Sequence, residues 1–389
     1  MSFDWISSEL AAWEEAGLRR ARRTVRPLPG GWIDVDGGRL LNLAANDYLC
    51  LAGDPRLSAA AEDALCAVGV GARASALVSG RTTFHEALER RLAAFERAEA
   101  AILFPTGYAA NTGTITALVD RDDSVFCDRL NHASIIDGCR LSGARLHVIP
   151  HLDLEALEQE LHKARERRRR LIVTDSVFSM DGDVADLPRL AELADRYDAM
   201  LLIDEAHATG VLGPGGRGLV EHFGIATDRV IHVGTLSKGI GCQGGFVTGP
   251  QRLIDWLWNK ARPQIFSTAL PPAIAAATCA AIDIIEAEPW RRERLRALSE
   301  ALQSRLRDAG FQVPATAVPT PIVPVVLGDE RTTLAAAAGL EEAGFLVAAI
   351  RPPTVPTGSS RLRISLHCEV SDEQVDRLVT AILQRVRGA

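Results

Sequence analysis

The sequence predicts an α/β protein with a large domain on a mostly parallel sheet of seven strands, followed by a smaller C-terminal α+β domain. Two observations predict this class. Seven short apolar runs alternate with helical patterns between residues 101 and 249, as is typical of parallel strands covered on both faces by helices. The pattern then changes to a long charged helix at residues 290–309 and three further short strands.

The elements follow one another in a simple order. Trp5, Leu10, Trp13 and Leu18 form an apolar stripe that predicts a helix within residues 1–25. The seven apolar runs, each expected to be a strand, begin at Ala101, Ser124, Arg145, Leu171, Met200, Val230 and Gly244. An Ala-rich buried helix is expected at 269–282, and the later strands at 322–327, 345–350 and 362–366. We expect an N-terminal helix and extension at 1–45, the large domain at 46–282 and the small domain at 283–389.

Composition limits the classes of function. The 389 residues carry a net charge of −7, which argues against a nucleic-acid binder. The seven cysteines are scattered without a Cys-x-x-Cys pair, as expected of reduced thiols in the cytoplasm. No apolar run reaches the length of a bilayer-spanning helix, and we expect no export signal, membrane segment or metal site.

Lys238 carries the strongest chemical signal. It lies in Thr-Leu-Ser-Lys-Gly, and Asp204 ends the apolar run Leu-Leu-Ile-Asp with His207 three residues later. A lysine that forms a Schiff base and an aspartate that keeps a pyridine nitrogen protonated are the two groups that pyridoxal phosphate (PLP) requires. Ser-Lys-Gly alone is usually an exposed turn and an Asp at a strand end is often a helix cap, but together they indicate a PLP site.

Three further features fit the same site. Gly107 and Tyr108 open a helical pattern directly after a strand, where backbone N–H groups can bind a phosphate. Thr235 lies next to the lysine segment and is expected to bind the same phosphate. His132 follows a strand and opens a helix, so it is placed either to stack on a planar cofactor or to serve a structural hydrogen bond.

Six segments resemble the α-oxoamine synthases, which are fold-type I PLP enzymes that join an amino acid to an acyl thioester with loss of carbon dioxide. The resemblance runs from about Leu18 to the C-terminus. The segments are Ala45-Asn-Asp-Tyr-Leu, Asp128-Arg-Leu-Asn-His-Ala-Ser, Ser176-Val-Phe-Ser-Met-Asp-Gly-Asp, Asp204-Glu-Ala-His-Ala-Thr-Gly-Val-Leu-Gly, Gly234-Thr-Leu-Ser-Lys and Phe266-Ser-Thr-Ala-Leu-Pro-Pro.

The resemblance implies a role for each candidate residue. Lys238 holds PLP as a Schiff base, Asp204 pairs with the pyridinium nitrogen, His207 binds the ring hydroxyl and His132 stacks on the ring and contacts substrate. The other implied cofactor contacts are Gly107, Tyr108, Ser179 and Thr235, with Ser267 and Thr268 reaching the partner subunit's cofactor in a homodimer. The implied substrate contacts are Arg19, Asn46, Thr354 and Arg363, and Arg20 aligns nearly as well as Arg19.

The segments Ile350-Arg-Pro-Pro-Thr-Val-Pro and His151-Leu-Asp-Leu-Glu resemble the members of this family that act in biotin synthesis. The implied substrates are L-alanine and pimeloyl-CoA or pimeloyl-acyl carrier protein. Two alternatives stay open, namely a related synthase that uses glycine or serine, and an aminotransferase on the same fold. The chain departs from the family at Arg73, where glycine is usual, and at Ala76, where a basic residue is common, so acyl recognition stays open.

Overall fold

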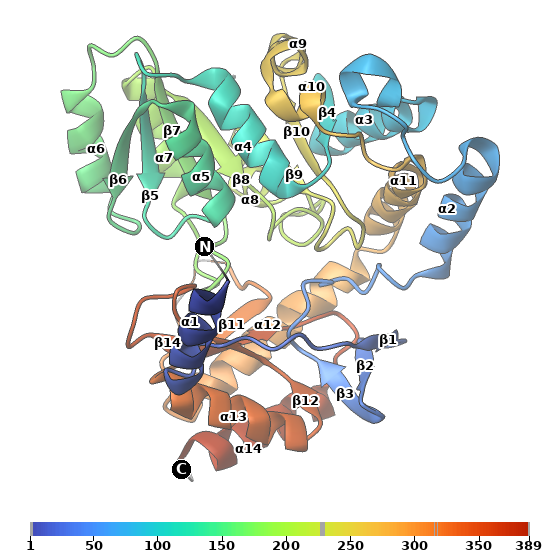
Figure 1. Ribbon diagram of the computed structural model, residues 1–389, viewed down its shortest axis with the longest axis vertical. Helices are drawn as coiled ribbons and strands as arrows, with labels where there is room; N and C mark the ends of the chain where they lie inside the picture. The colour runs from blue at the N-terminus through green and yellow to red at the C-terminus, as the bar shows by residue number, and fades with distance from the viewer. Residues whose placement is uncertain (1–2, 226–229, 315, 317, 388–389) are drawn as a thin grey trace. The chain divides into compact units, whose positions relative to one another are not determined.

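The computed structural model describes residues 3–225, 230–314, 316 and 318–387 and divides into two compact units. The large unit comprises Asp47–Ser179 and Asp183–Glu293, and the small unit comprises Met1–Asn46, Met180–Gly182 and Arg294–Ala389. Figure 1 labels the helices and strands of both. Within the described residues, no helix is both long and apolar enough to cross a bilayer.

The large unit is built on the expected seven-stranded sheet. The strands are β4 (Ala100–Phe104), β5 (Ser124–Asp128), β6 (Arg145–Ile149), β7 (Arg170–Asp175), β8 (Met200–Asp204), β9 (Val230–Thr235) and β10 (Gly245–Gly249). Their order is β4-β10-β9-β8-β7-β5-β6. The strands from β9 to β6 pair in parallel, whereas β10 is antiparallel to both of its neighbours. The predicted fold class, a mostly parallel sheet, is therefore confirmed.

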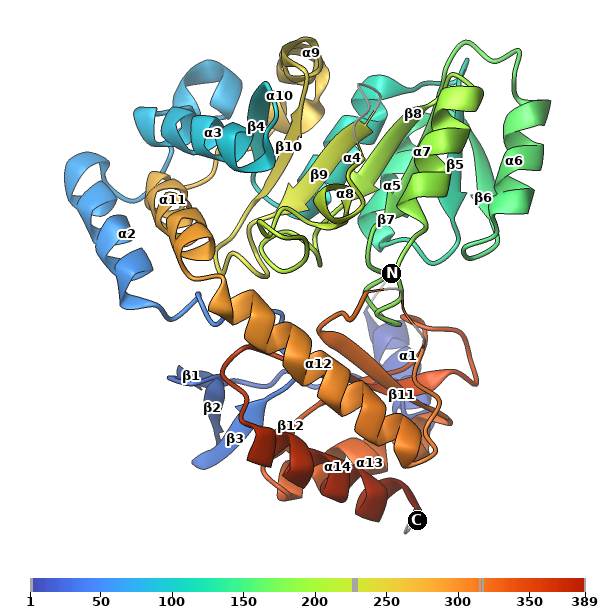
Figure 2. The same ribbon diagram turned by 180° about the vertical axis from the view of Figure 1, so that it is seen from behind.

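Helices cover both faces of this sheet. Helices α4 (Gly107–Leu118) and α5 (Ala133–Ser142) lie in front of it in Figure 1, and α7 (Leu187–Arg196) lies in front of it in the reverse view of Figure 2. The strands are apolar along their length because both faces are buried, and Val125, Leu171 and Leu202 belong to one core cluster. Each such side chain contributes about 1.5–3 kcal/mol of burial.

The other helices of the large unit complete this layer arrangement. Helices α3 and α9 pack on the antiparallel end of the sheet, while α2 packs against α11. Their bounds are α2 (Pro55–Val68), α3 (Thr83–Glu96), α6 (Leu154–Lys163), α8 (Leu219–His222), α9 (Gln251–Lys260), α10 (Arg262–Phe266) and α11 (Pro272–Ala287), with a short π-helix η1 at Ala76–Gly80.

The small unit contains two sheets. Strands β1 (Arg26–Leu28), β2 (Trp32–Val35), β3 (Gly38–Asn42) and β12 (Phe345–Leu346) form one, and β11 (Ile322–Gly328), β14 (Ser360–Ser365) and β13 (Ala348–Ile350) form the other. The helices are α1 (Asp4–Glu15), α12 (Trp290–Asp308), which enters this unit at Arg294, α13 (Glu330–Glu342) and α14 (Asp372–Arg387).

Two local expectations for this unit need correction. The strand expected at 345–350 is two short strands, because β12 pairs with β3 and β13 pairs with β14 in the other sheet. The N-terminal helix ends at Glu15, and Gly17 follows with a φ of 67° that breaks the helical backbone. The described part of the predicted helix is therefore shorter than residues 1–25.

Candidate active site

The site begins with Lys238, which follows β9 at the carboxyl edge of the large sheet. Its Nζ lies 2.9 Å from Nε2 of His207, and Nδ1 of His207 lies 2.6 Å from the hydroxyl of Tyr48. His207 and Tyr48 are both buried. The lysine amine is therefore the end of a series of three titratable groups, Tyr48, His207 and Lys238, that contact one another in turn.

Asp204 ends β8 and is held from two sides. Its Oδ2 accepts a hydrogen bond of 2.6 Å from Nδ2 of Asn111, and its Oδ1 accepts one of 2.8 Å from the backbone N–H of Ala206. Asn111 also donates to Oγ of Ser134 at 2.9 Å. Because β7 and β8 are parallel and in register, Asp175 lies directly beside Asp204. The carboxylate of Asp204 is thus fixed in a buried environment, as a partner for a protonated ring nitrogen must be.

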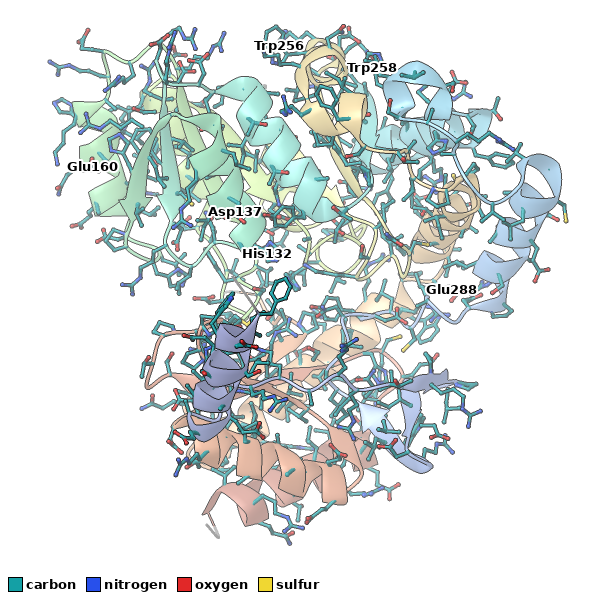
Figure 3. The ribbon with its side chains drawn as sticks, in the orientation of Figure 1. His132, Asp137, Glu160, Trp256, Trp258 and Glu288 are labelled. Atoms are coloured by element: carbon teal, nitrogen blue, oxygen red, sulfur yellow. The ribbon has the colours of Figure 1, made fainter. Side chains whose placement is uncertain are left out.

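His132 caps the N-terminus of α5, where Figure 3 labels it together with Asp137 of the same helix. Its backbone N–H donates to Oδ2 of Asp175 at 2.6 Å. The backbone N–H of Ser134 donates to its Nδ1, which places the ring proton on Nε2. Burial and the charge of Lys238 lower the pKa of His132, so its imidazole is neutral at neutral pH.

Burial and the charge of Asp204 also raise the pKa of Asp175 well above its usual value. Asp175 therefore holds a proton more readily than an exposed carboxyl group does, and it anchors the backbone of the loop that carries His132. Asn111 and Tyr48 were not predicted as site residues.

The N-terminus of α4 and the end of β9 lie together and form a cradle made by Gly107, Thr235 and Ser237. Helix α4 begins at Gly107, and a Cβ on Gly107 would lie 3.1 Å from Oγ1 of Thr235. Thr235 and Ser237 present hydroxyls 3.2 Å apart beside this helix end. Free N–H groups and the helix dipole make such a terminus suited to a phosphate. Glycine at position 107 is what permits the close approach.

Asn46 and Arg363 lie together in the small unit. Both Nη atoms of the Arg363 guanidinium lie 3.3 Å from Oδ1 of Asn46, and Nη1 donates to Oγ of Ser365 at 2.6 Å. Arg363 is buried on β14. An oriented, buried guanidinium of this kind is suited to a carboxylate ligand.

The remaining predicted residues lie outside these contacts. Ser179 follows β7 in a loop that the Val177–Val184 bridge closes. Tyr108 is half-exposed and donates to Oδ2 of Asp137 at 2.5 Å. Thr268 pairs with Ser75 in an isolated bridge, next to Ser267.

Arg19 and Thr354 belong to the small unit. Arg19 pairs with Glu14, and its carbonyl accepts a hydrogen bond of 3.0 Å from Nη2 of Arg351. Thr354 is exposed in the proline-rich loop that follows β13. Burial and the charge of Arg20 lower the pKa of Arg351, whereas the guanidinium of Arg19 is paired with Glu14.

The residues of the large unit fit PLP. A lysine amine, a fixed carboxylate, a neutral histidine and a helix N-terminus with two hydroxyls match its aldehyde, ring nitrogen, ring face and phosphate. The described residues contain no cluster of His, Cys, Asp and Glu able to hold a metal ion. The donor set thus defines a site for an organic phosphate cofactor.

Comparisons with known proteins agree with this site. Residues 39–382 match the family model described as aminotransferase class I and II. A serine palmitoyltransferase variant from S. paucimobilis, solved with a bound PLP–myriocin aldimine, is 30% identical, with a TM-score of 0.92, 99% of this chain covered and 98% of that one. The chain therefore belongs to the aminotransferase class I and II family of PLP-dependent enzymes.

Within this family, the chain is similar to 8-amino-7-oxononanoate synthases. The 8-amino-7-oxononanoate synthase of Anaeromyxobacter dehalogenans is 52% identical over 98% of this chain and 95% of its own length. The solved structure of 8-amino-7-oxononanoate synthase from Francisella tularensis is 28% identical, with a TM-score of 0.78, and covers 90% of this chain and 98% of that one. The chain is a member of the 8-amino-7-oxononanoate synthase branch.

Proposed function

We propose that this enzyme condenses L-alanine with a pimeloyl thioester to give 8-amino-7-oxononanoate, carbon dioxide and a free thiol, a step of biotin biosynthesis. The observation that carries the proposal is the assembly of Lys238, His207 and Asp204 beside the α4 anion cradle, in a chain 52% identical to an enzyme of that name. PLP, when bound, supplies an electron-accepting ring that stabilises negative charge on Cα of the amino acid.

The residues of the chain have distinct tasks in this reaction. Arg363 and Asn46 hold the carboxylate of alanine, and the guanidinium supplies two parallel donors. The amine of Lys238 takes the Cα proton as general base and later returns a proton to the product. His207 and Tyr48 orient that amine. When PLP is bound, Asp204 would keep its ring nitrogen protonated and His132 would contact its ring.

Two groups leave during the reaction, namely the thiol and carbon dioxide. The Cα carbon forms a bond to the thioester carbonyl, and the thiol leaves with the electrons of the broken C–S bond. The C–C bond to the carboxyl group then breaks, and carbon dioxide leaves. The neighbouring charges of Arg20 and Arg351 suit an anionic thioester carrier, whether coenzyme A or acyl carrier protein.

We also propose that two copies of the chain form a homodimer. Val70, Leu77, Val78 and Phe266 are exposed large apolar side chains on the segment around η1 and on α10, which pack against each other. Contiguous exposed apolar surface of this kind marks an interface. Ser267 and Thr268 adjoin this surface and would then reach the partner's cofactor. Light scattering should give twice the chain mass, and Val78→Glu should shift it towards the single-chain mass.

The cysteines support a cytoplasmic setting for the enzyme, since seven free thiols suit a reducing compartment. A different amino-acid substrate is the second candidate, because the serine palmitoyltransferase structure superposes on nearly the whole chain. The higher identity to the alanine-using branch favours alanine. Competition among alanine, glycine and serine at equal concentration distinguishes these assignments.

The direct test of the catalytic assignment is Lys238→Ala. This variant should lose the absorbance band of covalently bound PLP and at least about 100-fold in kcat, the range of a lost general base. Lys260, exposed at the end of α9, gives the matched control Lys260→Ala, which should keep both. Product formation at the wild-type rate by Lys238→Ala would refute the assignment.

A further inference from the structure

His151 lies between two carboxylates, one at the end of β5 and the other in the loop after β7. Its Nδ1 lies 3.0 Å and 3.1 Å from the two oxygens of Asp128, and its Nε2 lies 2.7 Å from Oδ2 of Asp183. The side chain of His151 is 16% exposed, and those of Asp128 and Asp183 are 11% and 19% exposed. Both ring nitrogens therefore face acceptors, which only the doubly protonated imidazolium satisfies.

The charges around the ring support this protonation state. Burial alone would lower the pKa of His151, but the hydrogen bonds and charges of Asp128 and Asp183 outweigh it and raise the pKa to about 9. These two carboxylates are the charged groups that act on the ring. Oδ1 of Asp183 is buried and has no hydrogen-bond partner in the described part of the chain, so the imidazolium is the main compensation for that charge.

Each of these two aspartates, through its backbone carbonyl, also accepts a hydrogen bond from a loop of the candidate active site. Asp128 ends β5, accepts the backbone N–H of Leu130 at 2.8 Å, and its carbonyl accepts that of Asn131, the residue before His132. The carbonyl of Asp183 accepts the N–H of Phe178, the residue before Ser179.

The His151 ring also makes an edge contact with the ring of Phe178, with centroids 4.5 Å apart. His151 therefore touches both loops, one leading to His132 and the other to Ser179.

We propose that His151 is a positioning residue whose imidazolium bridges Asp128 and Asp183 and so fixes the two loops that present His132 and Ser179 to PLP. The inference rests on the cofactor roles proposed above for those two residues. His151 touches neither substrate nor cofactor in this role. Replacing His151 by an uncharged residue would leave Asp128 and Asp183 without their shared cation. The loops that carry His132 and Ser179 would then lose the link between them.

The test compares PLP affinity of the apoprotein, kcat and KM in His151→Gln, Asp183→Asn and the double variant. His151→Gln should weaken PLP binding and lower kcat by about 10- to 100-fold, the range of lost supporting contacts at active sites. KM for L-alanine should stay near the wild-type value, because Arg363 holds the carboxylate. His162→Gln, an exposed histidine on α6, is the matched control and should change nothing.

Two readouts separate positioning from a general loss of structure. The ratio of wild-type to His151→Gln affinity for PLP should be large at pH 6.5 and approach one above pH 9, since the raised pKa keeps the imidazolium charged up to about 9. His151→Gln should also cost less in the Asp183→Asn background, where no buried charge is left uncompensated. An affinity ratio that is one at pH 6.5, or equally large at both pH values, would overturn the inference.

A measurement on the wild type covers the case in which His151→Gln does not fold. Ring-nitrogen NMR of histidine-labelled protein should show one histidine that titrates near pH 9, and its absence would overturn the inference. Failure of the proposed function is distinguishable, because the wild type would then bind PLP without condensing L-alanine with a pimeloyl thioester, while the PLP affinities would still report on His151. Normal PLP binding by both wild type and His151→Gln refutes the role of His151 alone.

Discussion

Replacing Asn111 by leucine should destabilise the protein strongly although Asn111 lies on an ordinary helix. Its amide is buried and donates to the carboxylate of Asp204 at 2.6 Å and to Oγ of Ser134 at 2.9 Å. Leucine has a similar size, removes both donors and excludes the water that could replace them. A hydrogen bond to a charged group contributes about 1.5–3 kcal/mol and one to a neutral group about 1 kcal/mol. We therefore expect the free energy of unfolding to fall by about 2.5–4 kcal/mol.

The assay is urea unfolding of the apoprotein at pH 7, which removes the contribution of bound PLP. Asn259→Leu is the matched control, because Asn259 is exposed on α9, where its amide donates to the carbonyl of Asp255. It should change the free energy of unfolding by less than about 0.5 kcal/mol.

A double-mutant cycle with Asp204→Asn tests the mechanism of this loss. It should give a coupling of at least about 1 kcal/mol between the two positions. An Asn111→Leu protein as stable as the wild type, or a cycle without coupling, would refute the reasoning.

Three further results are expected. Gly107→Ala should weaken PLP binding by about tenfold, because its Cβ would lie 3.1 Å from Oγ1 of Thr235. Gly53→Ala is the control, because no atom lies within 4 Å of its Cβ. Equal PLP affinities of the wild type and Gly107→Ala would contradict the assignment of the phosphate site to the start of α4. Arg363→Lys should raise KM for L-alanine by about tenfold or more, since lysine lacks the two parallel donors; an unchanged KM would place the carboxylate elsewhere. Burial lowers the pKa of His367 to about 4, so between pH 4 and 6.5 the unfolded chain binds more protons at this residue than the folded chain does. The free energy of unfolding should therefore rise from pH 4 to 6.5 by up to about 3 kcal/mol. His367→Leu should flatten that rise in urea titrations, and an unchanged pH slope would contradict it.

The sheet was predictable because its strands are buried on both faces. Runs such as Leu171–Asp175 and Met200–Asp204 are apolar almost throughout, and each appears as a strand. Pairing partners were less predictable, as the split of residues 345–350 between two sheets shows. A run of apolar residues indicates that a strand forms, but tertiary packing decides which neighbour it joins.

Some residues of the candidate site were likewise predictable from the sequence, and others were not. Lys238 and His207 were predicted from short motifs, and the structure places their side chains 2.9 Å apart. Asn111 and Tyr48 were missed because their partners lie 93 and 159 residues away in the chain.

One signal was available for Asn111. It stands four residues after Gly107, one helical turn into α4 and therefore on the same face as the helix end. No comparable local spacing relates Tyr48 to His207, so only the folded chain reveals that contact.

The most direct measurement mixes the purified protein with PLP, pimeloyl-CoA and one amino acid at a time, and follows products by mass spectrometry. L-alanine should give 8-amino-7-oxononanoate together with stoichiometric free coenzyme A and carbon dioxide, while glycine and L-serine give much less of their own ketones. Faster condensation with glycine or serine, or transfer of the amino group without release of carbon dioxide, would contradict the proposed reaction.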